Sequence, residues 1–138
     1  MRRAIYGVLI GVLWASAAVA RDAGGVAVDT LAKTTASWDG AALPAYPAGQ
    51  PQVTILRIRI PPGAELPRHY HPVINAAVLV AGQLTVITDR QETKHLKAGE
   101  ALVEVVGKWH FGRNDGSGPA DIVVFYAGTA GGPITVGE

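Results

Sequence analysis

A chain of 138 residues has room for one domain with a single core, and its 49% hydrophobic content excludes disorder as a description of the whole. The 17 glycines and 9 prolines interrupt the sequence often, which favours many short strands over a few long helices. A formal net charge of +1 provides no excess of basic residues that would bind nucleic acid electrostatically. The absence of cysteine excludes stabilisation by disulfide bonds.

Residues 1–20 have the pattern of a secretory signal peptide. Two arginines near the start precede an apolar run over 4–14, and small residues follow up to Ala20. The pattern predicts cleavage before Arg21 and a periplasmic or secreted protein, with an uncleaved membrane anchor as the alternative. Without this segment, 10 basic residues face 11 acidic ones, a net charge of −1. No remaining stretch is long and apolar enough to span a membrane, so no membrane association is expected after cleavage.

Residues 21–52 are expected to form an N-terminal arm. Prolines recur at 44, 47 and 51, too often for a regular element. We therefore expect an extended, proline-rich arm with one strand around Leu31 to Trp38. Such an arm is also a candidate for contact between the two copies of a homodimer.

The pattern changes at residue 53, where the main domain (53–138) is expected to begin. Leu56, Ile58 and Ile60 alternate with two arginines, which is the period of a half-buried strand. Further strands, separated by turn residues, are predicted over Ala76–Val80, Leu84–Thr88, Thr93–Leu96, Ala101–Val106 and Asp121–Tyr126. No helical apolar stripe follows residue 20. The sequence therefore predicts an all-β fold, a single jelly-roll β-barrel.

The candidate chemistry lies in the histidines, of which there are 4. His69 and His71 are two residues apart, so on a strand both imidazoles point to the same face and can reach one metal ion. His110 is the third candidate. The fourth, His95, lies beside a lysine on a predicted hairpin and is expected at the surface.

The spacing of these residues resembles the two sequence motifs of the cupin superfamily. Where the first motif has Gly, His-x-His, Glu and Gly, this chain has Gly63, His69, His71, Asn75 and Gly82. Where the second has Gly, Pro, Gly, His and Asn, it has Gly99, Val105, Gly107, His110 and Asn114. The resemblance implies a jelly roll that binds one divalent ion (Fe, Mn, Ni or Zn) through three histidines and a fourth ligand. It also implies that homodimers are common among its relatives.

Asn75 departs from the motif, which has a glutamate there as the fourth ligand. Asn75 offers at best a neutral carbonyl oxygen, so the ion would be more electrophilic and more weakly held. Three imidazoles are still a sufficient ligand set for a divalent ion. The alternative is a cupin-like pocket that binds no ion.

Two carboxylates are candidates for supporting the site. Glu104 lies in an apolar strand near His110 and would, if it turns inward, orient an imidazole; the alternative places it on the outer face. Glu65 shares the parity of the histidine pair if one strand is unbroken. Asn114 is expected to fix a turn, and Trp109, Phe111, Phe125 and Tyr126 are expected to pack in the core or line the pocket.

Together these patterns predict an exported metal-binding protein with a small-molecule ligand or substrate. One hypothesis is a metal-dependent enzyme of the oxygenase or isomerase type. The alternative is a noncatalytic periplasmic module that binds a small ligand or a metal. The sequence leaves open which of the two applies, because a cupin-like fold alone does not name a reaction.

Overall fold

The computed structural model describes residues 25–138, and the expected signal peptide lies outside them. Every regular element in this range is a β-strand, and no helix that could cross a membrane is found there. The strands are β1 (Pro51–Ile60), β2 (His69–Tyr70), β3 (Ile74–Ala81), β4 (Gln83–Thr88), β5 (Thr93–Lys97), β6 (Ala101–Val103), β7 (His110–Arg113), β8 (Ala120–Thr129) and β9 (Val136–Gly137).

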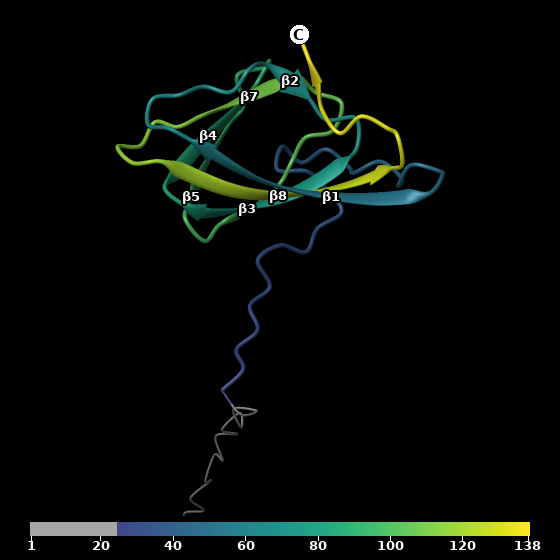
Figure 1. Cartoon of the computed structure of the whole chain (residues 1–138), viewed down its shortest axis with the longest axis horizontal. Helices are drawn as coiled ribbons and strands as arrows, with labels where there is room; N and C mark the ends of the chain where they lie inside the picture. Colours follow the sequence, from purple (N-terminus) through teal and green to yellow (C-terminus); the bar gives the residue numbers. More distant parts are fainter. Residues whose placement is uncertain (1–24) are drawn as a thin grey trace, which may run out of the picture.

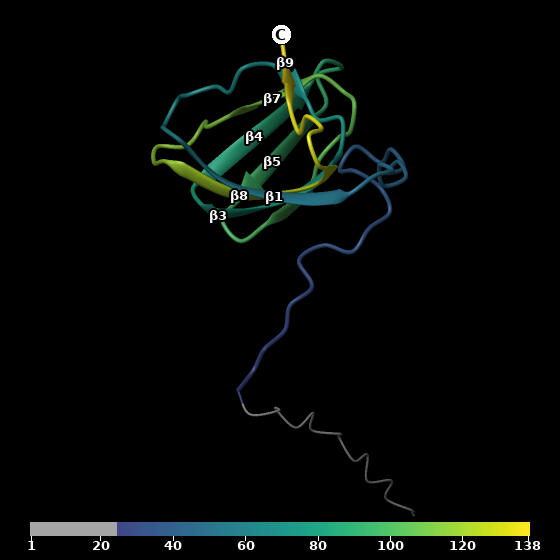
Figure 2. The ribbon, with the colours of Figure 1, turned by 45° about the vertical axis from the view of Figure 1, so that its right-hand side comes forward.

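These strands form two antiparallel sheets that face each other (Figure 1). One sheet has the strand order β1-β8-β3-β6, and the other has the order β5-β4-β7-β2-β9. Figure 2 shows β4, β5 and β7 as one layer over the layer of β1, β3 and β8. The predicted all-β jelly roll is confirmed, with two facing sheets in place of a barrel closed by hydrogen bonds.

Alternation along β8 explains how the sheets enclose one core. Ala120, Ile122, Val124 and Tyr126 are buried, and the residues between them are more exposed. Because successive side chains of a strand point to opposite faces, one face of β8 lies against the core and the other faces outward. Leu79 of β3 is fully buried in the same core. The apolar face of each sheet is thus covered by the other.

The strands predicted by alternation are present, with differences at their ends. The strand expected over 101–106 ends at Val103, because the chain then turns at Gly107, whose φ is +67°. The short strands β7 and β9 were not among the predicted runs. Segments of four and two residues are too short for alternation to reveal them.

The strand expected around Leu31 to Trp38 is wrong. Among the described residues of the arm, pairing there is limited to an isolated bridge between Ala36 and Ala42. The reason is a tight turn: Asp39 accepts hydrogen bonds from the Ser37 hydroxyl at 2.8 Å and from the Ala41 amide at 3.0 Å. Such local bonds compete with strand pairing. We call residues 36–42 the arm loop.

The arm loop packs on the jelly roll next to β6. The Trp38 amide donates to the carbonyl of Val103 at 2.9 Å, and the indole packs against the core cluster. In contrast, residues 25–35 are exposed; residues 29–32 lie beside β3 and β6, and the chain before them extends away from the sheets (Figure 1). The arm loop therefore belongs structurally to the jelly roll, although it precedes the first strand.

Gly82 joins β3 to β4 in a place where only glycine fits. Its φ is +77°, and a Cβ there would overlap the backbone of Pro119 and Ala120. This close approach brings the β3–β4 turn against the start of β8.

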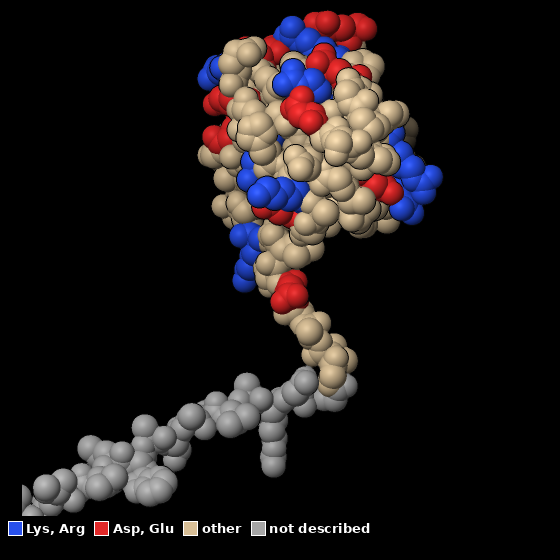
Figure 3. Space-filling model, turned by 90° about the vertical axis from the view of Figure 1, so that its left-hand side faces the viewer, with Lys and Arg blue, Asp and Glu red and all other residues tan. Residues whose placement is uncertain are grey.

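Charged residues on the surface are of both signs. On the face shown in Figure 3, basic and acidic groups are interspersed among uncharged residues, without a continuous basic stripe.

Candidate metal centre

Three histidines from two neighbouring strands meet between the sheets. His69 lies on β2 directly opposite His110 at the start of β7, and His71 directly follows β2, two residues after His69. His71 and His110 are buried, and His69 is partly buried. The side chain between the pair, Tyr70, packs instead on Trp109, with ring centroids 4.9 Å apart. The alternation predicted from the His-x-His spacing is thus how the two imidazoles come to share one site.

The three imidazoles are close enough to share one ion. Their ring centroids are 4.6 Å (His69–His110), 4.9 Å (His69–His71) and 5.1 Å (His71–His110) apart. One ring nitrogen from each lies within 4.8 Å of the others. This spacing suits donors that surround an ion about 2 Å from each of them.

Backbone carbonyls fix which nitrogen each ring offers. Nδ1 of His69 donates to the carbonyl of Pro67 at 2.6 Å, Nδ1 of His71 to that of Ile134 at 2.9 Å, and Nδ1 of His110 to that of Lys108 at 2.8 Å. A proton on Nδ1 leaves the Nε2 lone pair of a neutral imidazole free to bind a metal. In His110 this Nε2 is buried without a hydrogen-bond partner in the described chain. The residues therefore fit a divalent ion.

Burial keeps these imidazoles neutral. Desolvation lowers the pKa of His71 to about 4, although the hydrogen bond to Ile134 opposes the shift. It lowers the pKa of His69 and of His110 in the same way, against the bonds to Pro67 and Lys108. Metal binding requires the neutral form of each imidazole, so at neutral pH an ion would not have to displace protons from the Nε2 atoms.

Asn75 lies on β3 at the wall of the same cavity. It is 2% exposed, and its Nδ2 has no hydrogen-bond partner among the described residues. Leaving a buried N–H donor unpaired is costly, so Nδ2 points to an acceptor atom of a bound molecule, whereas a metal ion would need Oδ1. Asn75 is therefore placed with the histidines, whereas Asn114 bonds to Ile60, Gly116 and Gly118 in a turn, as expected.

Glu104 turns inward and lines the cavity. Its Oε1 accepts hydrogen bonds from Nε1 of Trp38 at 3.0 Å and from the Val105 amide at 3.3 Å. Burial raises the pKa of Glu104 to about 6, against these two bonds. The expected orienting bond to an imidazole is not found among the described residues, since all three Nδ1 atoms are held by backbone carbonyls.

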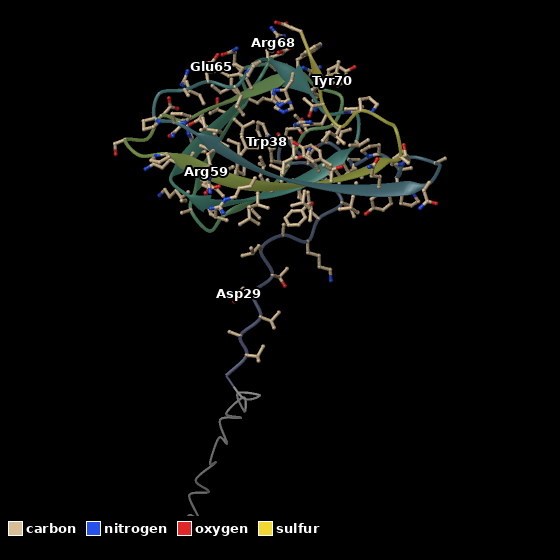
Figure 4. All side chains as sticks on the ribbon, in the orientation of Figure 1. Asp29, Trp38, Arg59, Glu65, Arg68 and Tyr70 are labelled. Carbon is tan, nitrogen blue, oxygen red and sulfur yellow. The ribbon has the colours of Figure 1, made fainter. Side chains whose placement is uncertain are left out.

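Glu65 does not reach the site. It is exposed, forms an isolated bridge with Arg113, and lies at the upper rim in Figure 4, while Trp38 lies toward the interior. Glu65 does not share the face of the histidine pair, because the chain between Glu65 and β2 is not an unbroken strand. His95 is exposed on β5, as expected.

The cavity itself is small, about 50 Å³. Besides the histidines, Asn75 and Glu104, its walls include Tyr126, whose ring lies 5.3 Å from that of His71. Tyr126 was expected only as a core or pocket aromatic. The contribution of Trp38 was missed, because no local pattern links it to a residue 66 positions later.

The fold and the site together define the class of protein: an all-β jelly roll with three convergent imidazoles between its sheets. The family model described as "Cupin domain" matches residues 56–126, which is just over half of the chain. The protein therefore belongs to the cupin family. No protein with a curated description matches its sequence.

Solved structures agree on the fold. An oxalate oxidase in complex with the substrate analogue glycolate is 28% identical, with a TM-score of 0.53 over 61% of this chain and 45% of that chain. An uncharacterized protein from Klebsiella pneumoniae with a double-stranded β-helix domain is 23% identical, with a TM-score of 0.54 over 67% of this chain and 89% of that one. Lactobacillus farciminis oxalate decarboxylase, as a formate complex, is 19% identical, with a TM-score of 0.54 over 62% and 26%. This chain thus spans less than half of the oxidase.

Proposed function

We propose that this protein is an exported metalloenzyme that binds one divalent ion through His69, His71 and His110 and acts on a small oxygen-bearing molecule. The observation that carries the proposal is the convergence of three neutral imidazoles whose Nδ1 atoms are all held by backbone carbonyls. Metal binding explains these preorganised Nε2 atoms, because leaving a buried nitrogen without a partner is unfavourable.

Imidazole donors suit iron, manganese, nickel or zinc, so the ion is one of these four. When bound, it would supply a Lewis acid that polarises an oxygen of the substrate. The chain's own residues would orient that molecule: the Asn75 amide and the Tyr126 ring line the same cavity as the ligands. The apolar walls would limit the access of water to the reacting atoms.

The substrate is proposed to be a short oxygen-rich molecule, of the size class of a two- or three-carbon acid. A cavity of about 50 Å³ has room for an ion and a molecule of a few heavy atoms, which excludes bulky ligands. The similarity to an oxalate oxidase holding glycolate supports this size class. A reaction of the oxygenase or isomerase type is proposed, taking place in the periplasm or outside the cell, as the pattern of residues 1–20 suggests.

A noncatalytic module that binds a small ligand or a metal is the second candidate. The observation in its favour is that Glu104 is the single acidic side chain at the cavity within residues 25–138. General acid–base chemistry would thus depend on one group.

The first test is elemental analysis of the mature protein purified without added metal. We expect close to one iron, manganese, nickel or zinc per chain, lost in the double variant His69→Ala/His110→Ala. The matched control is His95→Ala, an exposed histidine that should leave the metal content unchanged. Wild-type protein with no metal, and no thermal stabilisation by any of the four ions, would overturn the proposal.

The second test separates an enzyme from a binding module. The loaded protein is incubated with glycolate, oxalate and related short acids under air, and products are followed by mass spectrometry. Turnover that disappears in the histidine double variant supports the enzyme. Saturable binding without turnover supports the module.

A further inference from the structure

The proposed metal centre lacks a negative charge among its ligands. Three neutral imidazoles leave the full charge of a divalent ion uncompensated, and burying an uncompensated charge is strongly unfavourable. Asn75 is also neutral. The single acidic residue at the cavity wall, within the described chain, is Glu104.

Glu104 and Asn75 are neighbours across the sheet. The Glu104 amide donates to the Asn75 carbonyl at 3.2 Å. This bond lies one position beyond Ala76 and Val103, the last residue pair of β3 and β6. Both side chains are buried and both line the cavity, Glu104 at 8% and Asn75 at 2% exposure. A carboxylate at position 104, directly after the adjacent strand β6, therefore lines the same cavity as a side chain at position 75.

The carboxylate of Glu104 is buried without a cation. Lys108, the basic residue nearest in sequence, is paired with Asp39, and no ion pair of Glu104 exists among the described residues. Its hydrogen bonds come from Trp38 and Val105, and both end on Oε1. No hydrogen bond within the described chain reaches Oε2. A buried carboxylate without a cation beside it is rare in proteins.

We infer that Glu104 supplies the negative charge for the ion, with Oε1 held by Trp38 and Val105 and Oε2 left free of hydrogen bonds from the described chain. This inference rests on the proposed metal centre and adds a residue to it. Glu104 stays outside the group of mutually close donor atoms formed by the three histidines. It acts as the anionic partner of the three-histidine site and stabilises the ion electrostatically.

The test compares the affinity for Zn²⁺ and Co²⁺ in wild type and Glu104→Gln, by competition with a chromophoric chelator. Glutamine keeps an acceptor for Trp38 and Val105 and removes only the charge. Substitution of residues beyond the direct ligands typically weakens metal affinity about 10–100-fold, and we expect a loss in that range. Glu65→Gln is the matched control, because it removes the same charge at an exposed site away from the cavity; it should change affinity less than about two-fold. The visible spectrum of the Co²⁺ form gives a second readout and should change only in Glu104→Gln.

An exchange variant, Asn75→Glu/Glu104→Gln, moves the carboxylate to the neighbouring strand. Because a glutamate at position 75 is itself the motif's fourth ligand, this variant is compared with Asn75→Glu alone, which keeps Glu104. Lower affinity in the exchange variant supports the inference, and this comparison decides the matter should Glu104→Gln alone fail to fold; equal affinities in the two variants overturn it. If Glu104→Gln folds and binds both ions as tightly as Glu65→Gln does, the inference is refuted. That result leaves the metal centre standing, whereas absence of binding in wild type would refute the proposed function itself.

Discussion

The ion pair between Asp39 and Lys108 should hold the arm loop on the jelly roll. The Asp39 side chain is 2% exposed and that of Lys108 is 39% exposed. Burial by itself would raise the pKa of Asp39, but hydrogen bonds from Lys108, the Ala41 amide and Ser37 outweigh it and lower the pKa from 3.8 to about 2. A shift of this size corresponds to about 2 kcal/mol of folding free energy, and screening at the half-exposed lysine reduces it to about 1–2 kcal/mol.

Asp39→Asn should therefore lower the free energy of unfolding by about 1–2 kcal/mol at pH 7, or about 3–12 °C in Tm for a domain of this size. Because the folded-state pKa lies below the unfolded one, this stability is fully present above pH 4 and is lost as the pH falls toward 2. Urea unfolding of wild type and variant, measured with a chelator from pH 7 to pH 2, gives the difference directly.

The matched control for that series is Asp115→Asn, in which both members of the Arg113–Asp115 pair are close to half exposed. We expect a much smaller change there. A difference between wild type and Asp39→Asn that stays constant from pH 7 to pH 2 would show that the loss comes from packing or hydrogen bonding. It would refute the electrostatic reasoning.

Three further outcomes follow from the structure. Gly82→Ala should lower the free energy of unfolding by about 3 kcal/mol or more, because its Cβ overlaps the Pro119 backbone in addition to the strain of positive φ. Gly99→Ala, at φ +90°, meets no atom nearby and should lower it by about 1 kcal/mol. Equal values for the two variants in urea unfolding would contradict the overlap. Leu79→Ala, at a fully buried core position, should cost about 2–5 kcal/mol in the same assay, and a change under 1 kcal/mol would be inconsistent with its burial. In the metal-free protein, the lowered pKa of His71 means that the unfolded state takes up a proton at higher pH than the folded state. The free energy of unfolding should therefore fall by up to about 3 kcal/mol as the pH drops from 6.5 to 4, and by less in His71→Gln. A flat profile in wild type would argue against burial as the cause of the lowered pKa.

Much of the fold was predictable because strand alternation is a local property. The alternating Leu56, Ile58 and Ile60 predicted one strand of the sandwich, and glycine-containing turns predicted where strands end. The arm was mispredicted at Leu31 to Trp38 because a short turn with its own side-chain hydrogen bonds replaced strand pairing. The Asp39-Gly40 pair is a local turn signal, and Gly40, with φ of +86°, lies in that turn.

The site shows the same division. The sequence by itself determined the candidate donors, since a His-x-His pair needs only strand geometry to share a face, and it determined that position 75 carries no charge. Only the tertiary structure decided that His110 faces His69 across two strands, that the Ile134 carbonyl sets the tautomer of His71, and that Glu104 turns inward beneath Trp38. These contacts join residues about 40 to 65 positions apart. They form only when two sheets close over one core, and no local pattern of residues encodes which side chains then meet.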